Sequence, residues 1–352
     1  MGRRPTRFGE TREDMIRTLL VDGNGLFKVG FHGAKNMFNR DGDHIGGLYQ
    51  FLVTLRKLIK ERSYHNIIIF WDGKLSGKMR FELYSEYKES RNKNYVTGNV
   101  PDNEMNYLDQ KFKTEEYLED LAIKQYRHDI VEADDLIAHY CNNKKNNERI
   151  VICTNDEDIC QLIEENVVVY HCNKKRYFDT NGFRKEFGYP PENIKVVKIL
   201  TGDVSDCIKG VKGVGKKTLL KFFPDIKTAI LTLEDVRAKA KILQNNRIEA
   251  KQKPLKSLDN IINGVTDGSQ GDKLYEINEK IIDLRRPLIT EDCKNEVDII
   301  IDGDIDFEGR SLEHIYNKMV RDGLDNNISD NYLVEFLMPF KEYNNRYKKI
   351  TN

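Results

Sequence analysis

Two short apolar runs near the start of the chain each end in an Asp-Gly pair. The first, Ile16 to Val21, leads into Asp22-Gly23, and Asn66 to Trp71 leads into Asp72-Gly73 in the same way. Between them, Ile45 to Arg62 carries leucine and isoleucine at helical spacing. Short apolar runs bounded by turn residues predict buried strands, and a period near 3.6 residues predicts an amphipathic helix. The order strand, helix, strand favours a right-handed crossover within a parallel sheet.

The α/β pattern continues and then gives way to helices. Two β-branched runs, Arg149 to Cys153 and Val167 to Tyr170, predict further strands around a short helix over Asp156 to Glu165. Asp259 to Asp272, rich in Gly, Asn and Asp, is typical of a linker, and Val297 to Ile301 is typical of a strand. The later segments that predict helices are Lys195 to Leu200, Lys216 to Phe223, Ala238 to Leu243, Leu274 to Leu284 and Asp330 to Tyr347.

These patterns divide the chain into four expected regions. A frayed polar leader covers residues 1–14, and an α/β core covers 15–200. A polar, basic and aromatic stretch at about 74–95 interrupts the core just after a strand end, which is typical of a substrate lid. A helical region at 201–258 and a C-terminal helical extension at 259–352 with an acidic segment complete the division.

The charges are balanced in total but not along the chain. The sequence has 57 Lys+Arg and 57 Asp+Glu, so its net charge is zero. Lysines and arginines nevertheless dominate from Lys209 to Lys256, and carboxylates dominate from Glu291 to Asp330. A basic segment of this kind favours contact with a phosphate backbone, whereas the neutral average alone would argue against a polyanionic partner.

The cysteines and the apolar runs indicate a reducing compartment and no membrane. None of the six cysteines forms a CxxC pair, and several lie inside apolar runs. No apolar run approaches the ~20 residues that span a bilayer. We therefore expect a cytoplasmic protein.

Acidic residues recur where predicted strands end or predicted helices begin. Carboxylates that converge on one site repel one another unless hard cations neutralise them, so this pattern favours Mg²⁺, or Mn²⁺ in its place. Two such ions ~4 Å apart activate water and stabilise a leaving oxygen in phosphodiester cleavage. Any one of these acids alone is more often a helix cap or a turn residue, but the strings LLVDGN, IIFWDG, VEADDL, TNDEDI and TGDVSD occur in order. Their candidate ligands are Asp22, Asp72, Glu132, Asp134, Asp135, Asp156, Asp158, Asp203 and Asp206.

The basic insertion combines cations with aromatic rings, as single-strand channels do. Its cations include Lys74, Lys78, Arg80, Lys88, Arg91 and Lys93, and its rings are Phe81, Tyr84, Tyr87 and Tyr95. The alternative is a solvated amphipathic helix whose rings pack inward, and for Phe81 and Tyr84 the two interpretations are equally favoured.

The segment Gly210 to Thr218 nearly matches a nucleotide-binding P-loop. It has the glycines and Lys216 at the right spacing, but Lys217 stands where the magnesium-binding hydroxyl belongs, and no strand is predicted before it. The better interpretation is two helices joined by a glycine-rich hairpin whose backbone N–H groups hold a phosphate without reading bases. Its candidate DNA-binding residues are Lys209, Lys212, Gly213, Gly215, Lys216 and Lys217.

Taken together, the strings VDGN, FWDG, RFELYSEYKESR, EADD, TNDED and TGDVSDCIKGVKGVGKKT resemble the flap endonuclease and 5′-3′ exonuclease family. The likeness is greatest to its phage and polymerase-linked bacterial branch; it spans Ile16 to Phe223 and extends weakly to about Pro287. The resemblance implies a PIN-like α/β core with a parallel sheet, a helical arch formed by the insertion, and a helix-two-turn-helix module that binds DNA.

The resemblance also implies a role for each matching residue. Asp158, Asp203 and Asp206 would bind a second metal, Asp135 would support the site, and hairpin carbonyls would bind a monovalent cation, often K⁺. Lys88 and Arg91 would hold the scissile phosphate, and Tyr87 would stack on a nucleotide. The first metal would lie among Asp22, Asp72, Glu132, Asp134 and Asp156, the last of them shared.

We therefore expect a structure-specific 5′ nuclease, with both 5′-3′ exonuclease and flap endonuclease activity, that acts in replication or repair. Branched or 5′-flap DNA is the expected substrate, and RNA/DNA hybrids are allowed because backbone contacts do not enforce a sugar. A monomer in the bacterial nucleoid or in phage-infected host cytoplasm is expected, with replication proteins docking on the C-terminal extension. The alternatives are a PIN-like ribonuclease, which lacks the hairpin and the insertion, a lapsed DNA-binding scaffold, which predicts missing carboxylates, and a P-loop ATPase.

Overall fold

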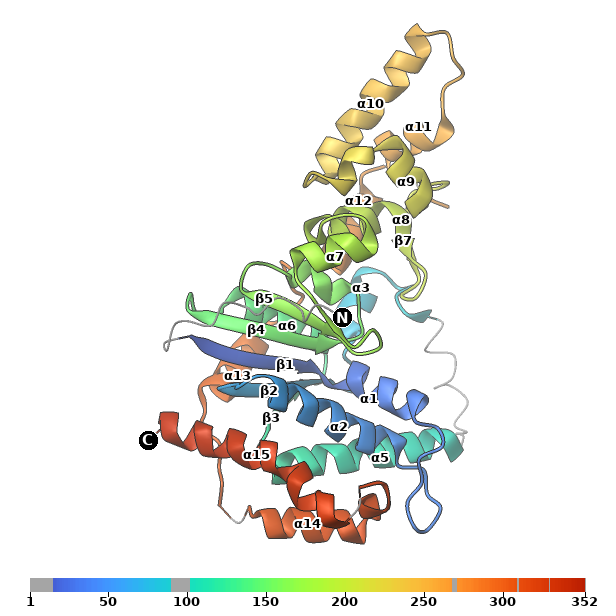
Figure 1. Cartoon of the computed structure of the whole chain (residues 1–352). Helices are drawn as coiled ribbons and strands as arrows, with labels where there is room; N and C mark the ends of the chain where they lie inside the picture. The colour runs from blue at the N-terminus through green and yellow to red at the C-terminus, as the bar shows by residue number, and fades with distance from the viewer. Residues whose placement is uncertain (1–14, 90–101, 268–270, 309, 329, 352) are drawn as a thin grey trace, which may run out of the picture.

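The computed structural model describes residues 15–89, 102–267, 271–308, 310–328 and 330–351 (Figure 1). The proposed phosphate ligand Arg91 and the proposed DNA contact Lys93 lie outside these residues, as do the leader and the end of the insertion. No helix in the described part of the chain is long and apolar enough to cross a membrane.

A six-stranded sheet forms the centre of the molecule, in the order β3-β2-β1-β4-β5-β6. The first five strands run parallel and β6 pairs antiparallel with β5. The strands predicted at β1, β2, β4 and β5 are confirmed, but β3 was missed because only Tyr126 in its sequence KQYRH is buried. The strands are β1 (Ile16–Asp22), β2 (Asn66–Asp72), β3 (Lys124–His128), β4 (Glu148–Thr154), β5 (Val167–His171) and β6 (Arg176–Phe178).

Alternate side chains of the sheet point into two cores. Leu19 and Val21 of β1 pack on one side, and Leu20 packs on the other, as the period of two in a strand requires. Helices α1 (Gly23–Gly33), α2 (Gly46–Glu61), α5 (Asp102–Asp120), α14 (Leu312–Arg321) and α15 (Asp330–Thr351) cover the first side. The second side is covered by α6 (Ala133–Asn142), η1 (Asp158–Leu162) and α13 (Glu291–Asp302), among others.

The predicted strand Val297 to Ile301 is wrong, because these residues lie within α13. Thr290 caps this helix by accepting a hydrogen bond from the Cys293 amide at 3.2 Å. Cys293 and Val297, four residues apart, are both fully buried. A short β-branched run therefore fits a helical face as well as a strand, and tertiary burial decides between them.

The last helices complete the main core. Phe336, Phe340 and Tyr343 of α15 are buried in the same cluster as β1 and β2, and the Tyr343 hydroxyl accepts a hydrogen bond from the Ile67 amide at 3.2 Å. Helix α15 thus packs in the same core as the sheet. The proposed domain boundaries stay predictions.

Above the sheet, a helical lobe holds the later basic segment (Figure 1). It contains α7 (Thr180–Phe187), η2 (Pro191–Asn193), α8 (Ile194–Thr201), the two-residue strands β7 (Gly202–Asp203) and β8 (Ile208–Lys209), α9 (Lys216–Phe222), η3 (Pro224–Lys227), α10 (Leu233–Glu249), α11 (Lys256–Asn263) and α12 (Lys273–Ile282). The remaining elements are α3 (Lys78–Leu83) in the insertion and η4 (Leu324–Asn327).

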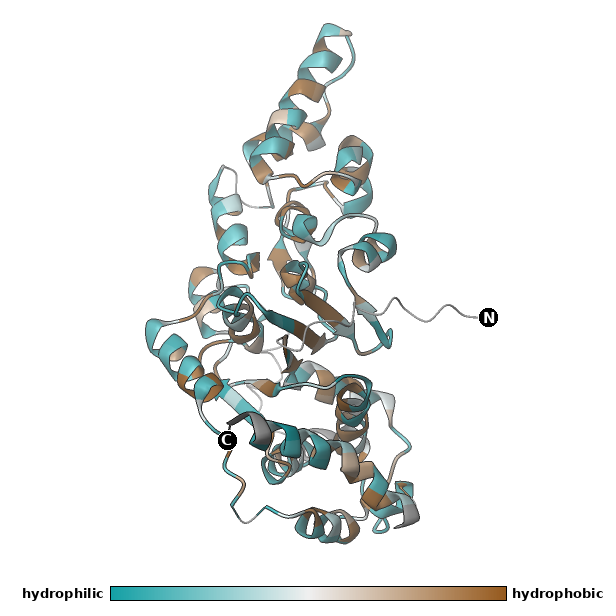
Figure 2. Ribbon diagram, turned by 60° about the vertical axis from the view of Figure 1, so that its left-hand side comes forward, coloured by the Kyte–Doolittle hydropathy of each residue, from teal (hydrophilic) through white to brown (hydrophobic). Residues whose placement is uncertain are grey.

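The linker predicted over Asp259 to Asp272 is wrong in its first half. Its residues up to Asn263 belong to α11, where Leu258 and Ile261 are buried. Figure 2 shows hydrophobic colour concentrated on the strands, whereas α10 and α11 alternate between hydrophilic and hydrophobic residues. Helix α11 is amphipathic and is stabilised by its one buried face, which the polar composition of the segment concealed.

Candidate active site

Asp22 and Asp72 lie side by side at the carboxyl ends of two paired parallel strands. Asp22 caps α1, accepting a hydrogen bond from the Gly25 amide at 2.8 Å and another from the Thr154 hydroxyl at 2.8 Å. Asp72 accepts from the Asn24 side-chain amide at 2.8 Å and from the Ala133 amide, at the start of α6, at 2.9 Å. The strand ends and the first turns of two helices therefore meet at one point, as expected for an open parallel sheet.

The carboxylates at this point repel one another. Burial, with smaller contributions from the neighbouring Asp72 and Asp156, raises the pKa of Asp22 to about 7. Burial also holds the pKa of Asp134 well above its ordinary value, with further contributions from Asp156, Asp22 and Asp72. So many buried carboxylates at neutral pH need protons or a hard cation to offset their charge. In metal sites, the bound cation neutralises them. This set of residues therefore fits a divalent cation.

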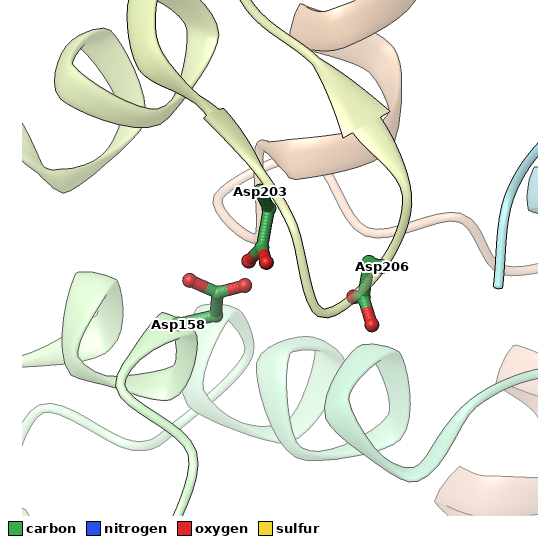
Figure 3. A group of neighbouring side chains, drawn as sticks. All are labelled: Asp158, Asp203 and Asp206. Carbon is green, nitrogen blue, oxygen red and sulfur yellow. The ribbon is translucent and has the colours of Figure 1, made fainter. Parts of the chain in front are cut away.

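Asp158, Asp203 and Asp206 form a second set of carboxylates (Figure 3). One oxygen from each of Asp158, Asp203 and Asp206 lies within 4.8 Å of the others, close enough to share an ion. Asp203 is the last residue of β7, Asp206 lies in the turn before β8, and Asp158 is the first residue of η1. Asp156 lies near both sets, because its carboxylate accepts a hydrogen bond from the Asp158 amide at 2.8 Å and its charge raises the pKa values of Asp22 and Asp134.

Lys198 partly neutralises the second set. Its ammonium forms ion pairs with Asp158 and, at 2.5 Å, with Asp203. Burial and Asp156 still raise the pKa of Asp158 to about 7. Burial would also raise that of Asp203, but hydrogen bonds from Lys198 and Ser205 lower its pKa to about 2. The sequence reasoning missed Lys198, and its one signal was a lysine within an apolar helical run just before two aspartates.

Arg80 is not the DNA contact that the sequence predicted. Arg80 is 5% exposed, and it pairs with Asp135 and, at 2.8 Å, with Glu132. Asp135 also accepts a hydrogen bond from the Leu288 amide at 2.9 Å. Because these donors occupy its carboxylate, the geometry favours the supporting role of Asp135 over direct metal binding.

The stacking role implied for Tyr87 also conflicts with the structure. Tyr87 is 3% exposed, and its hydroxyl donates to Glu132 at 3.0 Å, so its ring is part of the core. Lys88 agrees better with expectation, because its ammonium lies 2.5 Å from Glu132 at the edge of the acidic site. Of the two rings left open, Tyr84 is partly buried and Phe81 is 47% exposed.

The glycine-rich hairpin joins α8 to α9 as predicted. A Cβ on Gly210 would lie 2.2 Å from the carbonyl carbon of Thr201, and Gly213 has a left-handed φ of 77°, so both positions favour glycine. Lys216 and Lys217 are exposed, whereas Lys209 pairs with Glu86 at 2.7 Å and Lys212 pairs with Asp267. The predicted K⁺ site stays a prediction.

Comparisons with known proteins show which family this chain is similar to. Residues 17–188 match the family described as 5′-3′ exonuclease, N-terminal resolvase-like domain. A 5′-3′ exonuclease of Mycoplasmopsis pulmonis is 30% identical over 242 residues, which cover 67% of this chain and 77% of the relative. DNA polymerase I of Bacillus subtilis is 29% identical over 63% of this chain but only 25% of the polymerase.

The fold agrees with that of a solved structure. The T5 5′-exonuclease with bound divalent metal ions (zinc) superposes with a TM-score of 0.60 at 18% identity, over 88% of this chain and 98% of that chain. The expected α/β, PIN-like fold with a parallel sheet is therefore confirmed.

Proposed function

Because the chain belongs to the 5′-3′ exonuclease family and is therefore a nuclease, we propose that it is a structure-specific 5′ nuclease that cuts branched or 5′-ended DNA with two Mg²⁺ ions. The observation that carries this proposal is the pair of carboxylate sets with Asp156 near both of them. Asp22, Asp72, Glu132, Asp134 and Asp156 would hold one ion, and Asp158, Asp203 and Asp206 would hold the other.

The bound cations would supply activation of a water molecule and neutralisation of charge on the leaving oxygen. The residues of the chain would position the cations and bind the substrate. The rigid ends of β1, β2 and β4 hold the carboxylates in place, which offsets the entropy of ordering the substrate. In this structure Lys88 pairs with Glu132. With a bound cation neutralising Glu132 in place of Lys88, the ammonium of Lys88 would be available to hold the scissile phosphate.

The substrate would be recognised through its backbone. The insertion packs against the turn that carries Asp206, since the Lys88 amide donates to the Asp206 carbonyl at 3.0 Å, and the glycine-rich hairpin follows that turn in the chain. The hairpin presents Gly213 and Gly215 with no atom within 4 Å of their Cβ positions, so a phosphate has room to approach the backbone. Contacts of this kind respond to the shape of a branched duplex and do not depend on its base sequence. K⁺ at the hairpin carbonyls and Mn²⁺ in place of Mg²⁺ remain part of the proposal.

The test is cleavage of a 5′-labelled flap duplex with and without Mg²⁺, beside Asp156→Asn and Asp203→Asn. We expect cutting near the junction that requires Mg²⁺ and is lost in both variants while flap binding persists. Asp41→Asn is the matched control, since Asp41 is exposed in the loop between α1 and α2, and it should cut normally. Tight flap binding by the wild-type protein without any cutting would favour a lapsed scaffold instead.

Flaps with a 5′ RNA segment extend the test to primers. Equal cutting of RNA and DNA flaps is expected, because the proposed contacts are to phosphates. A strong preference for one sugar would mean that the site reads the 2′ position.

A role in replication or repair, in the bacterial nucleoid or in a phage-infected cell, belongs to the same proposal, as does docking of replication proteins on the C-terminal region. The surface rather than the whole region must be tested, because deleting residues after Leu288 would remove buried residues such as Phe340 and Tyr343. Exposed Tyr332 and Val334 are suitable positions for substitution.

A further inference from the structure

Helices α10 and α11 form a hairpin, residues 233–263, that we call the arm. In both views it projects away from the sheet beyond the glycine-rich hairpin (Figures 1 and 2). The 17 residues of α10 give the arm a length of ~25 Å at 1.5 Å per residue. Neither the carboxylate site nor the glycine-rich hairpin needs an element this far from the sheet, so the arm calls for a separate explanation.

The arm is built as a rigid element. At its base, the Arg237 guanidinium donates to the Ile262 carbonyl at 2.9 Å and pairs with Asp272 at 2.7 Å. Farther out, Gln244 is buried and donates to Asp259 at 2.6 Å, and its carbonyl accepts from the Leu255 amide at 3.1 Å. These bonds join the two helices along their length, so the connecting loop is held at a fixed distance from the body of the protein.

The loop at the far end, residues 250–256, is the arm tip. Lys251, Lys253 and Lys256 are all exposed there. Within the described part of the chain, none of these three ammonium groups forms an ion pair, whereas lysines nearer the base such as Lys239 do, here with Asp225 at 2.6 Å. The loop itself is ordered, because Arg247 donates to the Lys253 carbonyl at 3.0 Å and the Gln252 amide donates to the Arg247 carbonyl at 2.8 Å.

Three unpaired cations on one ordered loop repel one another and attract a polyanion. The glycine-rich hairpin, with exposed Lys216 and Lys217, lies in the same lobe, so a duplex held there continues past the body of the protein. We propose that the arm tip is a second contact to the backbone of the same duplex. An arm ~25 Å long reaches about 7 base pairs farther, at 3.4 Å per pair.

This inference rests on the proposed function, because it takes duplex DNA as the substrate. The test variant carries Lys251→Gln, Lys253→Gln and Lys256→Gln together. The control carries Lys60→Gln, Lys185→Gln and Lys341→Gln, which removes the same charge from exposed lysines outside the arm. Binding is measured by fluorescence anisotropy in EDTA on flap substrates, with each duplex segment set in turn to 6 or 18 base pairs, over a range of salt concentrations.

We expect the wild-type protein and the control to bind more tightly when one of the two duplex segments is lengthened from 6 to 18 base pairs. The tip variant should lose this gain in affinity. On the long duplex the slope of log affinity against log salt should fall by up to ~2.7, at ~0.9 for each phosphate contact, and affinity in 0.1 M salt should fall about tenfold or more. On the short duplex the tip variant and the wild type should agree. An unchanged slope and an unchanged gain from lengthening would overturn the assignment.

The two proposals fail separately. If the wild-type protein cuts flaps with Mg²⁺ but the tip variant keeps the wild-type slope, the arm assignment is wrong and the nuclease proposal stands. If the protein cuts no flap, while the tip variant loses the gain on long duplexes, the arm remains a duplex contact and the proposed cleavage of flaps is wrong.

Discussion

Replacing Arg80 by methionine tests the buried ion pairs that support the acidic site. Arg80 lies between Glu132 and Asp135, and all three side chains are 7% exposed or less. Removing one partner of such a pair leaves a buried charge without compensation and costs about 3–5 kcal/mol. The Ile281 carbonyl, which accepts a hydrogen bond from Arg80 at 3.1 Å, loses its donor as well. The unsatisfied carbonyl costs roughly a further 1–3 kcal/mol.

We therefore expect Arg80→Met to lower the free energy of unfolding by at least about 3 kcal/mol, read from urea midpoints at pH 7.5 in EDTA. The control is Lys78→Met in the same short helix, where the side chain is 52% exposed; a change within about 0.5 kcal/mol is expected there.

A double variant separates charge from packing. Arg80→Met with Asp135→Asn removes the charge of Asp135 but keeps an acceptor for the Leu288 amide, while Glu132 keeps Lys88 as its partner. It should be more stable than Arg80→Met alone, by a coupling of roughly 1–3 kcal/mol. Additive losses in the double variant, or a loss below about 1 kcal/mol in Arg80→Met, would refute the argument that the pairing of these charges stabilises the fold.

Three further predictions concern acidity, backbone conformation and the insertion. The pKa values of Asp22 and Asp158 are raised to about 7 in the folded protein, so the folded state binds more protons than the unfolded chain between about pH 4 and pH 7. In EDTA, urea midpoints should therefore fall as pH rises through this window, and Mg²⁺ should restore more stability at pH 8 than at pH 5; a midpoint that rises from pH 5 to pH 8 without metal would contradict this. Ala122 follows the end of α5 by two residues and has a left-handed φ of 56°; its amide donates to the Glu119 carbonyl, and the Ile123 amide donates to the Leu118 carbonyl. Ala122→Gly should stabilise the fold by about 0.5 kcal/mol and Ala122→Val should destabilise it by more than about 1 kcal/mol. Equal effects of the two variants on the urea midpoint would count against strain at this position. Phe81→Ala should leave the urea midpoint unchanged, since the ring is 47% exposed, but weaken binding of a flap by about 1–3 kcal/mol relative to a nicked duplex if the ring stacks on the single strand; equal loss on both substrates in an anisotropy titration would exclude stacking.

Local patterns carried much of the fold and of the candidate site. Apolar runs with turn residues identified β1, β2, β4 and β5, because burial of a strand leaves a mark in a few consecutive residues. The carboxylates after those strands were predictable for the same reason, since parallel strands bring their carboxyl ends to one edge. The polar strand β3 left no such mark, because it is buried mainly through Tyr126.

The roles of the cations were decided by tertiary structure alone. Arg80, Lys88 and Lys251 belong to basic segments that look alike in the sequence, yet one is buried between two carboxylates, one lies at the acidic site and one is exposed at the arm tip. Lys198 became part of the site only because a turn brought Asp203 back to η1. The sequence by itself determined which residues could bear the chemistry and where the strands would place their ends. Only the folded chain decided which charges are neutralised from within, because ion pairs depend on distances across the structure that no local pattern records.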